Sequence, residues 1–250
     1  MIPPTSIDGT DITGATIDGT DVQEITVDGD VVFSSGPDIP DSGDLHARYD
    51  ATQLGLSNNA TVTTWADETA NGYDLTTGNA PTYIANGING NPVVRFDGVD
   101  DFLQTDWPDI SQPNHIFIAF QLVNVQTTTE NVIYDSFTST NRHVFVQDGV
   151  SGGWTLFSGI NLRGGSADGN PHIHSHLFNS SNTELREDGT DIFNGNSGGQ
   201  SMDGITLGAR VDGGIPTNVD IGEILVYPQD KSGIQTQVEN YLGNKWGISI

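Results

Sequence analysis

The stretch Asn91–Leu103, which reads Asn-Pro-Val-Val-Arg-Phe-Asp-Gly-Val-Asp-Asp-Phe-Leu, constrains the fold more than any other part of the chain. Val94 and Phe96 lie two residues apart, which predicts a strand with one apolar face. Asp97-Gly98 favours a tight turn, and Phe102-Leu103 begins a second strand. We therefore interpret this stretch as a β-hairpin.

Short apolar segments separated by Gly, Asn and Asp recur along the rest of the chain, as all-β domains require. The segment His115–Val123 is apolar on both faces, which is typical of a central strand covered on both sides. Further strands are predicted over residues 61–65, 131–135, 143–147, 154–157, 173–178, 183–186, 191–193, 204–210 and 219–227. This recurrence predicts a β-sandwich or jelly roll.

One helix is predicted near the C-terminus. Ser232 and Gln235 fit a capping box, and an apolar face at helical spacing follows, ending near Gly243 and Gly247. The residues of that face are Ile234, Val238, Tyr241 and Leu242. We expect the helix to lie across one open end of the sandwich as a plug.

The N-terminal thirty residues contain a repeat with a period of ten. Ile7-Asp8-Gly9-Thr10, Ile17-Asp18-Gly19-Thr20 and Val27-Asp28-Gly29-Asp30 each place Asp-Gly where a tight turn would lie. The repeat predicts a small β-meander, which is too short to bury a core unaided, because domains below about 40 residues usually need a partner, a metal or disulfides. The segment therefore has to pack against something else.

A Gly-, Pro- and Ser-rich stretch follows, and it reads as a linker. We accordingly expect three parts: an N-terminal β-repeat docking module (residues 1–35), a linker (36–43) and a jelly roll (44–250). The alternative is a plain N-terminal extension that packs on its own jelly roll.

The net charge of −25 is the strongest compositional signal. It argues against nucleic-acid binding, since an acidic surface repels phosphate backbones. The acids are scattered along the whole chain and do not cluster in one ligand loop, which favours a protein adapted to molar salt over an acidic extracellular protein that holds a few calcium ions. Cysteine is absent, so disulfide and thiolate chemistry are excluded. No apolar run long enough for membrane insertion and no export signal is visible.

Several motifs resemble those of laminin-G-like, concanavalin A-like jelly rolls, and together they cover most of residues 44–250. They are Asn91–Leu103, Thr64–Asp67, Asn71–Leu75, Ile221–Tyr227 and Tyr241–Gly247. The resemblance implies an all-β, two-sheet jelly-roll sandwich with one C-terminal helix, in which Trp65 is a core residue. It also implies sugar binding as a common activity of the fold, through exposed aromatics near rim loops, for which Tyr83, Trp107 and Trp154 are weak candidates.

Catalysis is not expected. Glycosidases on this fold need two carboxyl groups about 5–9.5 Å apart, and the Glu-x-Asp-x-x-Glu motif of one such hydrolase family is absent. Glu184 and Glu187 are predicted to straddle a turn, and Glu223 resembles a structural position. No cofactor is required by any motif in the chain.

Two groups of residues are weak candidates for a metal. His172, His174 and His176 alternate along one predicted strand, although a solvated sheet face is the favoured interpretation. Asp97, Asp100 and Asp101 offer oxygen ligands suited to calcium, and laminin-G-like domains often carry calcium at a rim loop. The sequence leaves calcium open at this loop without predicting it.

The repeat followed by a jelly roll also resembles surface proteins of tailed haloarchaeal viruses. The resulting expectation is a non-enzymatic virion surface protein, a capsid turret, capsid decoration or tail fibre of a halophilic virus, located on the virion in a high-salt environment. Its partners would be capsid or tail proteins, bound through residues 1–35, and further copies of the chain in a homo-oligomer. The alternative is a carbohydrate-binding adhesin that recognises host surface glycans, and a glycoside hydrolase is a distant third.

Overall fold

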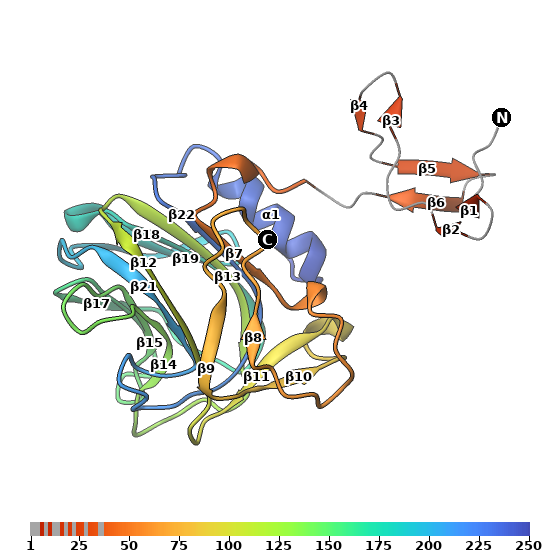
Figure 1. Ribbon diagram of the computed structural model, residues 1–250. Helices are drawn as coiled ribbons and strands as arrows, with labels where there is room; N and C mark the ends of the chain where they lie inside the picture. Colours follow the sequence, from red (N-terminus) through yellow and green to blue (C-terminus); the bar gives the residue numbers. More distant parts are fainter. Residues whose placement is uncertain are drawn as a thin grey trace. The chain divides into compact units, whose positions relative to one another are not determined.

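The computed structural model describes residues 6–7, 10–11, 16–17, 20–21, 24–27, 30–34 and 38–250 (Figure 1). The chain divides into two compact units, Met1–Ser42 and Gly43–Ile250. In the described part no helix is both long and apolar enough to cross a bilayer.

The N-terminal unit contains three antiparallel hairpins. Its strands are β1 (Ser6–Ile7), β2 (Thr10–Asp11), β3 (Thr16–Ile17), β4 (Thr20–Asp21), β5 (Glu24–Val27) and β6 (Asp30–Ser34). They pair as β1–β2, β3–β4 and β5–β6, and among the described residues no ladder joins one hairpin to the next. Each hairpin brackets one Asp-Gly pair of the repeat, and those pairs lie outside the described residues. The small β-meander predicted here is, in the described strands, three antiparallel hairpins.

The larger unit is an all-β sandwich of two antiparallel sheets, as the sequence predicts (Figure 1). The first, which we call the helix sheet, has the order β10-β11-β22-β13-β18-β19-β20, with β7 also paired to β22. Its strands are β7 (Ala47–Asp50), β10 (Thr82–Ile84), β11 (Val93–Asp97), β13 (Asn114–Leu122), β18 (Pro171–Phe178), β19 (Thr183–Glu187), β20 (Thr190–Gly195) and β22 (Asn218–Tyr227).

The second sheet, which we call the groove sheet, has the order β17-β16-β15-β14-β21-β12-β9-β8. Its strands are β8 (Thr64–Trp65), β9 (Leu75–Asn79), β12 (Phe102–Ile110), β14 (Asn131–Asp135), β15 (Val144–Gln147), β16 (Trp154–Phe157), β17 (Asn161–Gly164) and β21 (Met202–Leu207). Strands β7, β9, β10 and β17 were not predicted, because they are short or polar.

The main core lies between the sheets. Ile116, Ile118 and Phe120 of the central strand β13 face it, as does Trp65, which is 1% exposed and confirms its predicted core role. Residues on the inner faces alternate with residues on the outer faces, so each strand contributes every second side chain to this core.

The predicted hairpin over Asn91–Leu103 is wrong. Both strands exist, but β11 pairs with β10 and β22, whereas β12 pairs with β9 and β21. The intervening residues therefore cross from one sheet to the other. Gly98 adopts a φ of +76°, and a Cβ there would lie 2.9 Å from the backbone nitrogen of Asn218, so glycine suits both the turn and the close approach.

Helix α1 (Gln235–Trp246) packs on the outer face of the helix sheet, so the predicted plug is wrong (Figure 1). Trp246 is fully buried against Gly222 of β22, where an added Cβ would lie 2.6 Å from the indole ring. The predicted apolar face is confirmed at Val238, Tyr241 and Leu242, which are buried.

The predicted capping box is also wrong. The N-cap is Ile234, which makes no side-chain cap, and Gln235 instead donates to Ser175 Oγ at 2.8 Å. The helix continues through Gly243 and ends at Gly247, whose φ of +65° is the left-handed geometry of a glycine C-cap.

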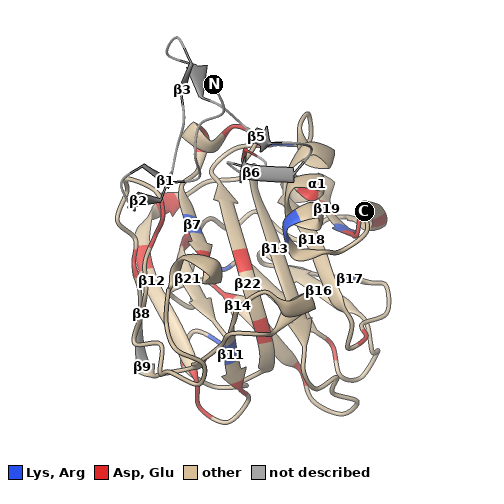
Figure 2. Cartoon of the chain, turned by 90° about the vertical axis from the view of Figure 1, so that its right-hand side faces the viewer, with Lys and Arg blue, Asp and Glu red and all other residues tan. Residues whose placement is uncertain are grey.

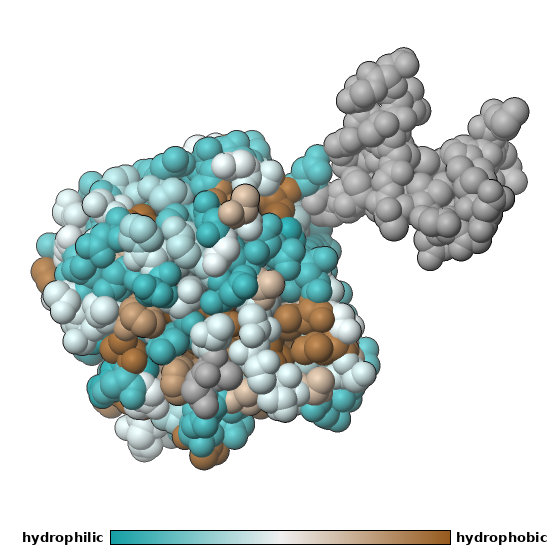
Figure 3. All heavy atoms as spheres, in the orientation of Figure 1, coloured by the Kyte–Doolittle hydropathy of each residue, from teal (hydrophilic) through white to brown (hydrophobic). Residues whose placement is uncertain are grey.

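Each of the eight Lys and Arg side chains of the protein pairs with a carboxylate. Because these pairs are neutral, the charge of −25 resides in the remaining acids, and red dominates the charged positions in Figure 2. Hydrophilic residues cover most of the visible sandwich surface in Figure 3, with apolar residues confined to small patches.

Candidate functional site

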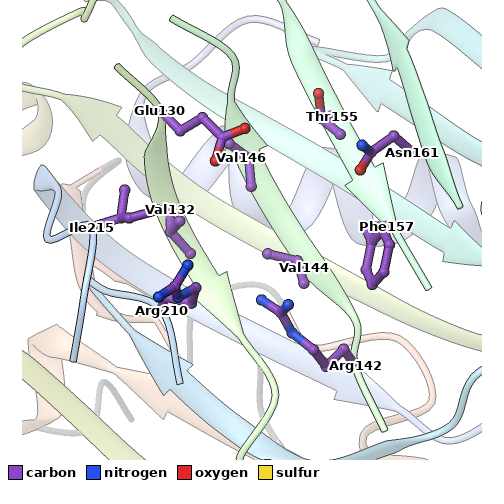
Figure 4. Close-up of a pocket in the computed structure, with 10 residues that line it drawn as sticks. All are labelled: Glu130, Val132, Arg142, Val144, Val146, Thr155, Phe157, Asn161, Arg210 and Ile215. Atoms are coloured by element: carbon purple, nitrogen blue, oxygen red, sulfur yellow. The ribbon is translucent and has the colours of Figure 1, made fainter. Parts of the chain in front are cut away.

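A groove of about 220 Å³ lies on the outer face of the groove sheet (Figure 4). Strands β14, β15, β16 and β17 run side by side beneath it, and the β21–β22 loop forms one wall. Its lining residues are Glu130, Val132, Arg142, Val144, Val146, Thr155, Phe157, Asn161, Arg210 and Ile215.

The floor of the groove is apolar because β14 and β15 are apolar on both faces. Ile133 and Phe145 point into the main core, so their neighbours Val132, Val144 and Val146 point outward and form a second, separate apolar cluster. These three valines are 2%, 4% and 7% exposed, respectively. The groove thus has a hydrophobic floor on a face that faces solvent elsewhere.

Arg142 is held at one end of the groove by a fully buried carboxylate. Its Nε and Nη2 donate to Asp135 at 3.0 and 2.5 Å, a bidentate pair that fixes the guanidinium plane. The guanidinium also lies 5.6 Å from the ring centroid of Phe157, within cation–π range. Nη1 of Arg142 has no hydrogen-bond partner among the described residues.

Arg210 forms the matching pair with Asp212, at 2.9 Å from Nε and 2.6 Å from Nη2. This hydrogen-bonded pair raises the pKa of Arg210 and lowers the pKa of Asp212. The same loop places Ile215 against the valine cluster with a φ of +51°, which is a strained conformation for a β-branched residue. Figure 4 shows the two guanidinium groups on the same side of the groove.

The opposite side of the groove is polar. Thr155 is 4% exposed, and its Oγ1 has no hydrogen-bond partner among the described side chains and backbone. Asn161 and Glu130 are exposed nearby (Figure 4). An unpartnered buried hydroxyl is unfavourable unless water or a ligand satisfies it.

The groove combines an apolar floor with fixed donors and acceptors, which is the composition of a small-molecule binding site. Glu130 is the one carboxylate among its lining residues. Most glycosidases cleave the glycosidic bond with a pair of carboxyl groups.

The three histidines predicted on one face of a strand do share a face of β18, but the expected solvated face is wrong. His174 and His176 are fully buried in the core between the sheets, and His172 is 9% exposed. A hydrogen-bonded chain links Glu187 to His174 Nε2 (2.9 Å), His174 Nδ1 to His176 Nε2 (3.2 Å), and His176 Nδ1 to the hydroxyl of Tyr134 (2.9 Å).

This chain employs all four ring nitrogens of His174 and His176, so both rings are satisfied without a metal. Burial lowers the pKa of both side chains, which keeps them neutral. Burial also acts to lower the pKa of His172, but hydrogen bonds to Asp188 and Asp168 outweigh it and raise that pKa to about 9. The geometry assigns a structural role to the pair at 174 and 176.

The three aromatic candidates for sugar stacking are not exposed. Tyr83, Trp107 and Trp154 are 6%, 5% and 1% exposed and belong to the main core. The Nε1 of Trp154 donates to Glu187 at 2.8 Å. None of the three rings therefore offers a face to a ligand in solution.

The acidic candidates come together at the crossover between the sheets. Ligand oxygens of Asp97, Asp100 and Asp101 lie within 4.8 Å of one another, close enough for one cation to bridge. Burial raises the pKa of Asp101 to about 6, and its Oδ2 accepts the backbone N–H of Asp97. Calcium at this loop stays a hypothesis.

The three glutamates considered for catalysis are separated. Glu184 and Glu187 do not straddle a turn; both lie in β19, where Glu184 accepts from Gln235 of α1 and Glu187 accepts from His174. Glu223 is fully buried and accepts hydrogen bonds from Arg48, Tyr241, Lys245 and Trp246. These contacts give all three structural roles.

Comparison of the chain with protein-family models and with curated protein sequences found no match. Solved structures do resemble it. The sialidase of Trypanosoma rangeli in complex with sialic acid aligns with a TM-score of 0.59 and 12% identity, over 90% of this chain and 36% of that one. The chain thus spans about a third of the sialidase.

Two further solved structures resemble the chain. Domain 4 of AbnA, a GH43 extracellular arabinanase from Geobacillus stearothermophilus in complex with arabinotriose, aligns with a TM-score of 0.56 and 16% identity, over 79% of this chain and 98% of that domain. The binding domain of botulinum neurotoxin serotype D/C aligns with a TM-score of 0.58 and 12% identity, over 82% of this chain and 52% of that one. At such identities the likeness concerns the β-sandwich fold.

Proposed function

We propose that the unit Gly43–Ile250 is a non-enzymatic carbohydrate-binding module and that the groove over β14–β17 is its binding site. The observation that carries the proposal is the apolar floor of Val132, Val144 and Val146 beside the fixed guanidinium groups of Arg142 and Arg210. Sugars present C–H groups and hydroxyls within one ring, and a site of this composition satisfies both.

The electrostatics favour a neutral sugar. The positive charges of Arg142 and Arg210 are neutralised by Asp135 and Asp212, and Glu130 leaves the groove with a net negative charge. An anionic ligand would also approach a chain of charge −25. The complex of the similar arabinanase domain with arabinotriose agrees with a neutral saccharide as the class of ligand.

Glycan-array binding and calorimetry with the full chain in molar NaCl test the proposal. We expect Arg210→Gln to weaken binding at least ten-fold, because it removes donors at the groove. Arg163→Gln is the matched control, since Arg163 pairs with Asp148 and does not line the groove. If no glycan binds, or if both variants bind as the parent does, the groove is not a sugar site.

The same preparations test the non-enzymatic part of the proposal. We expect no new reducing ends when the protein is incubated with a panel of polysaccharides. Hydrolysis that depends on Glu130 would instead make the module a glycosidase.

We further propose that residues 1–35 attach the sandwich to the capsid or tail of a halophilic virus, as a turret, decoration or fibre head in several copies. The supporting observation is that Met1–Ser42 is a compact unit of its own whose described strands form three short hairpins, each too small to bury a core. A module this weak gains avidity when several copies engage together.

Truncation tests this attachment. A chain that starts at Asp44 should stay folded and soluble yet fail to join particles or to oligomerise, as measured by circular dichroism and sedimentation. Loss of folding would show instead that the first residues complete the sandwich. Capsid and tail genes beside this reading frame would support the virion role.

A further inference from the structure

The apolar floor of the groove suits a methyl-sized group better than a flat sugar face. It consists of branched aliphatic side chains, and the one aromatic residue in the lining is Phe157, whose ring lies under the guanidinium of Arg142. A ring with one face engaged in this way is poorly placed to stack on a pyranose. The valine cluster instead offers a small hydrophobic recess.

The donors beside that recess suit a carbonyl acceptor. Nε and Nη2 of both arginines donate to Asp135 and Asp212, which fixes the guanidinium planes and leaves each Nη1 without a hydrogen-bond partner among the described residues. An amide oxygen is a stronger acceptor than a sugar hydroxyl, and it carries no net charge that the groove would repel.

The acceptors lie on the other side of the floor. Thr155 Oγ1 is buried and unpartnered among the described residues, and Asn161, which pairs with Phe157 across β16 and β17, lines the same groove (Figure 4). Ring hydroxyls are the groups on a saccharide that both donate to and accept from such partners. The groove thus runs from carbonyl-binding donors, over a methyl-sized apolar floor, to hydroxyl-binding groups.

We infer that the groove selects an N-acetylated amino sugar. The acetyl methyl lies on Val144 and Val132, the acetyl oxygen accepts from Nη1 of Arg142 or Arg210, and the ring hydroxyls face Thr155 and Asn161. This inference rests on the proposed glycan-binding function and names the sugar class for the same site.

Calorimetry with the full chain in molar NaCl tests the inference against a panel of N-acetylglucosamine, N-acetylgalactosamine, glucose, galactose, rhamnose and N-acetylneuraminic acid. We expect one of the two neutral acetamido sugars to bind at least ten-fold tighter than its parent hexose. We expect N-acetylneuraminic acid to bind worse than either, because its carboxylate meets Glu130 and the acidic chain.

Two near-isosteric substitutions locate the acetyl group. Val144→Thr puts a hydroxyl in the floor and should lower acetamido-sugar affinity about ten-fold, a larger loss than for the parent hexose. Thr155→Val should weaken both sugars alike. Val99→Thr is the control, since Val99 is 71% exposed and outside the groove.

Ligand-observed NMR on the unmodified chain covers the case in which a variant fails to fold. Saturation transfer should be strongest at the acetyl methyl protons. Equal or tighter binding of the parent hexose or of rhamnose, or saturation mainly at ring protons, overturns the acetamido inference and leaves the glycan function standing. If no sugar in the panel or on a wider array binds, both fall.

Discussion

The outer faces of the two sheets carry the same kind of ion pair in opposite settings. On the helix sheet, which we call the closed face, Arg48 pairs with Asp50 and Glu223 beneath α1, and Lys245 from the helix joins them. On the groove sheet, the open face, Arg142 and Asp135 pair with no described helix above them. Comparison of the two faces suggests that cover, more than residue type, separates a structural ion pair from one that is able to bind a ligand.

Salt concentration should have the largest effect on stability. Salt screens the repulsion between acids that lack a basic partner, and it hardly affects the buried ion pairs. The Debye length grows from about 3 Å at 1 M to about 30 Å at 0.01 M salt, so dilution exposes the self-repulsion of a chain of charge −25. We expect the sandwich to unfold on dialysis into dilute buffer without calcium and to refold when NaCl is restored. Circular dichroism during a salt titration measures this, and a melting temperature indifferent to NaCl would contradict it.

Removing one carboxylate charge from each face sharpens the comparison. Glu223→Gln leaves Arg48 and Lys245 undercompensated beneath the helix, so we expect a loss of about 3–5 kcal/mol in the free energy of unfolding. Asp212→Asn is the matched change on the open face, and there we expect less than about 1 kcal/mol. Chemical denaturation in high salt provides both values. Similar losses at the two positions would remove the distinction between the faces.

Low pH should also destabilise the fold, through two buried histidines. Burial lowers the pKa of His115, beneath the helix, to about 3 and that of His143 to about 4, whereas both titrate near 6.5 in the unfolded chain. Protonation therefore favours unfolding, and stability should fall as pH drops below 6.5, by on the order of 1 kcal/mol per pH unit for each histidine.

His172 should have the opposite effect on the pH dependence of stability, because its pKa in the folded protein is raised to about 9. Its stabilising contribution is complete below 6.5 and is lost as pH rises from 6.5 to 9. Denaturation profiles of the parent and of His172→Gln should therefore differ in slope on the alkaline side. A stability profile that is flat from pH 4 to 6.5 would argue against the buried neutral histidines.

Packing of the closed face is tested at Gly222. An alanine there would press a methyl group into the ring of Trp246, and we expect about 1–3 kcal/mol of destabilisation. Gly233→Ala is the control, because a Cβ at that position meets nothing within 4 Å. Equal melting temperatures for the two variants would indicate that α1 is not tightly docked.

The smallest effect on stability is expected on the open face at Ile215. Replacement by glycine relieves the strain of a positive φ and removes part of the groove wall, so stability should stay within about 1 kcal/mol of the parent. Glycan affinity should nevertheless fall, which calorimetry will detect. A large loss of stability with unchanged affinity would mean that Ile215 serves the fold alone.

Much of the strand pattern can be predicted from the sequence because burial leaves a local signature. Alternating apolar residues located β11, short apolar segments between turn residues located β14 and β22, and the apolar run at His115–Val123 identified β13 as a central strand. Which strands pair is not local. Asp97-Gly98 signals a reversal equally well for a hairpin and for a crossover between sheets, so that prediction failed.

The lack of a local signal for strand pairing also explains why the candidate sites were not predicted correctly. The spacing of His172, His174 and His176 predicts a shared face but not which layer covers it. The groove was missed because Arg142, Thr155 and Arg210 come from segments that only the sheet order brings together. One usable signal was present: β15 is apolar on both faces, as β13 is, and a strand of that kind needs cover on its outer side.

The engagement of all eight basic side chains has a practical consequence for handling the protein. Residues 1–47 contain no Lys or Arg, and both lysine amines are held by carboxylates, so the folded chain should resist trypsin and react sluggishly with amine-directed cross-linkers. Proteases that cut at acidic residues, and carbodiimide coupling through carboxyl groups, are the reagents that suit this molecule.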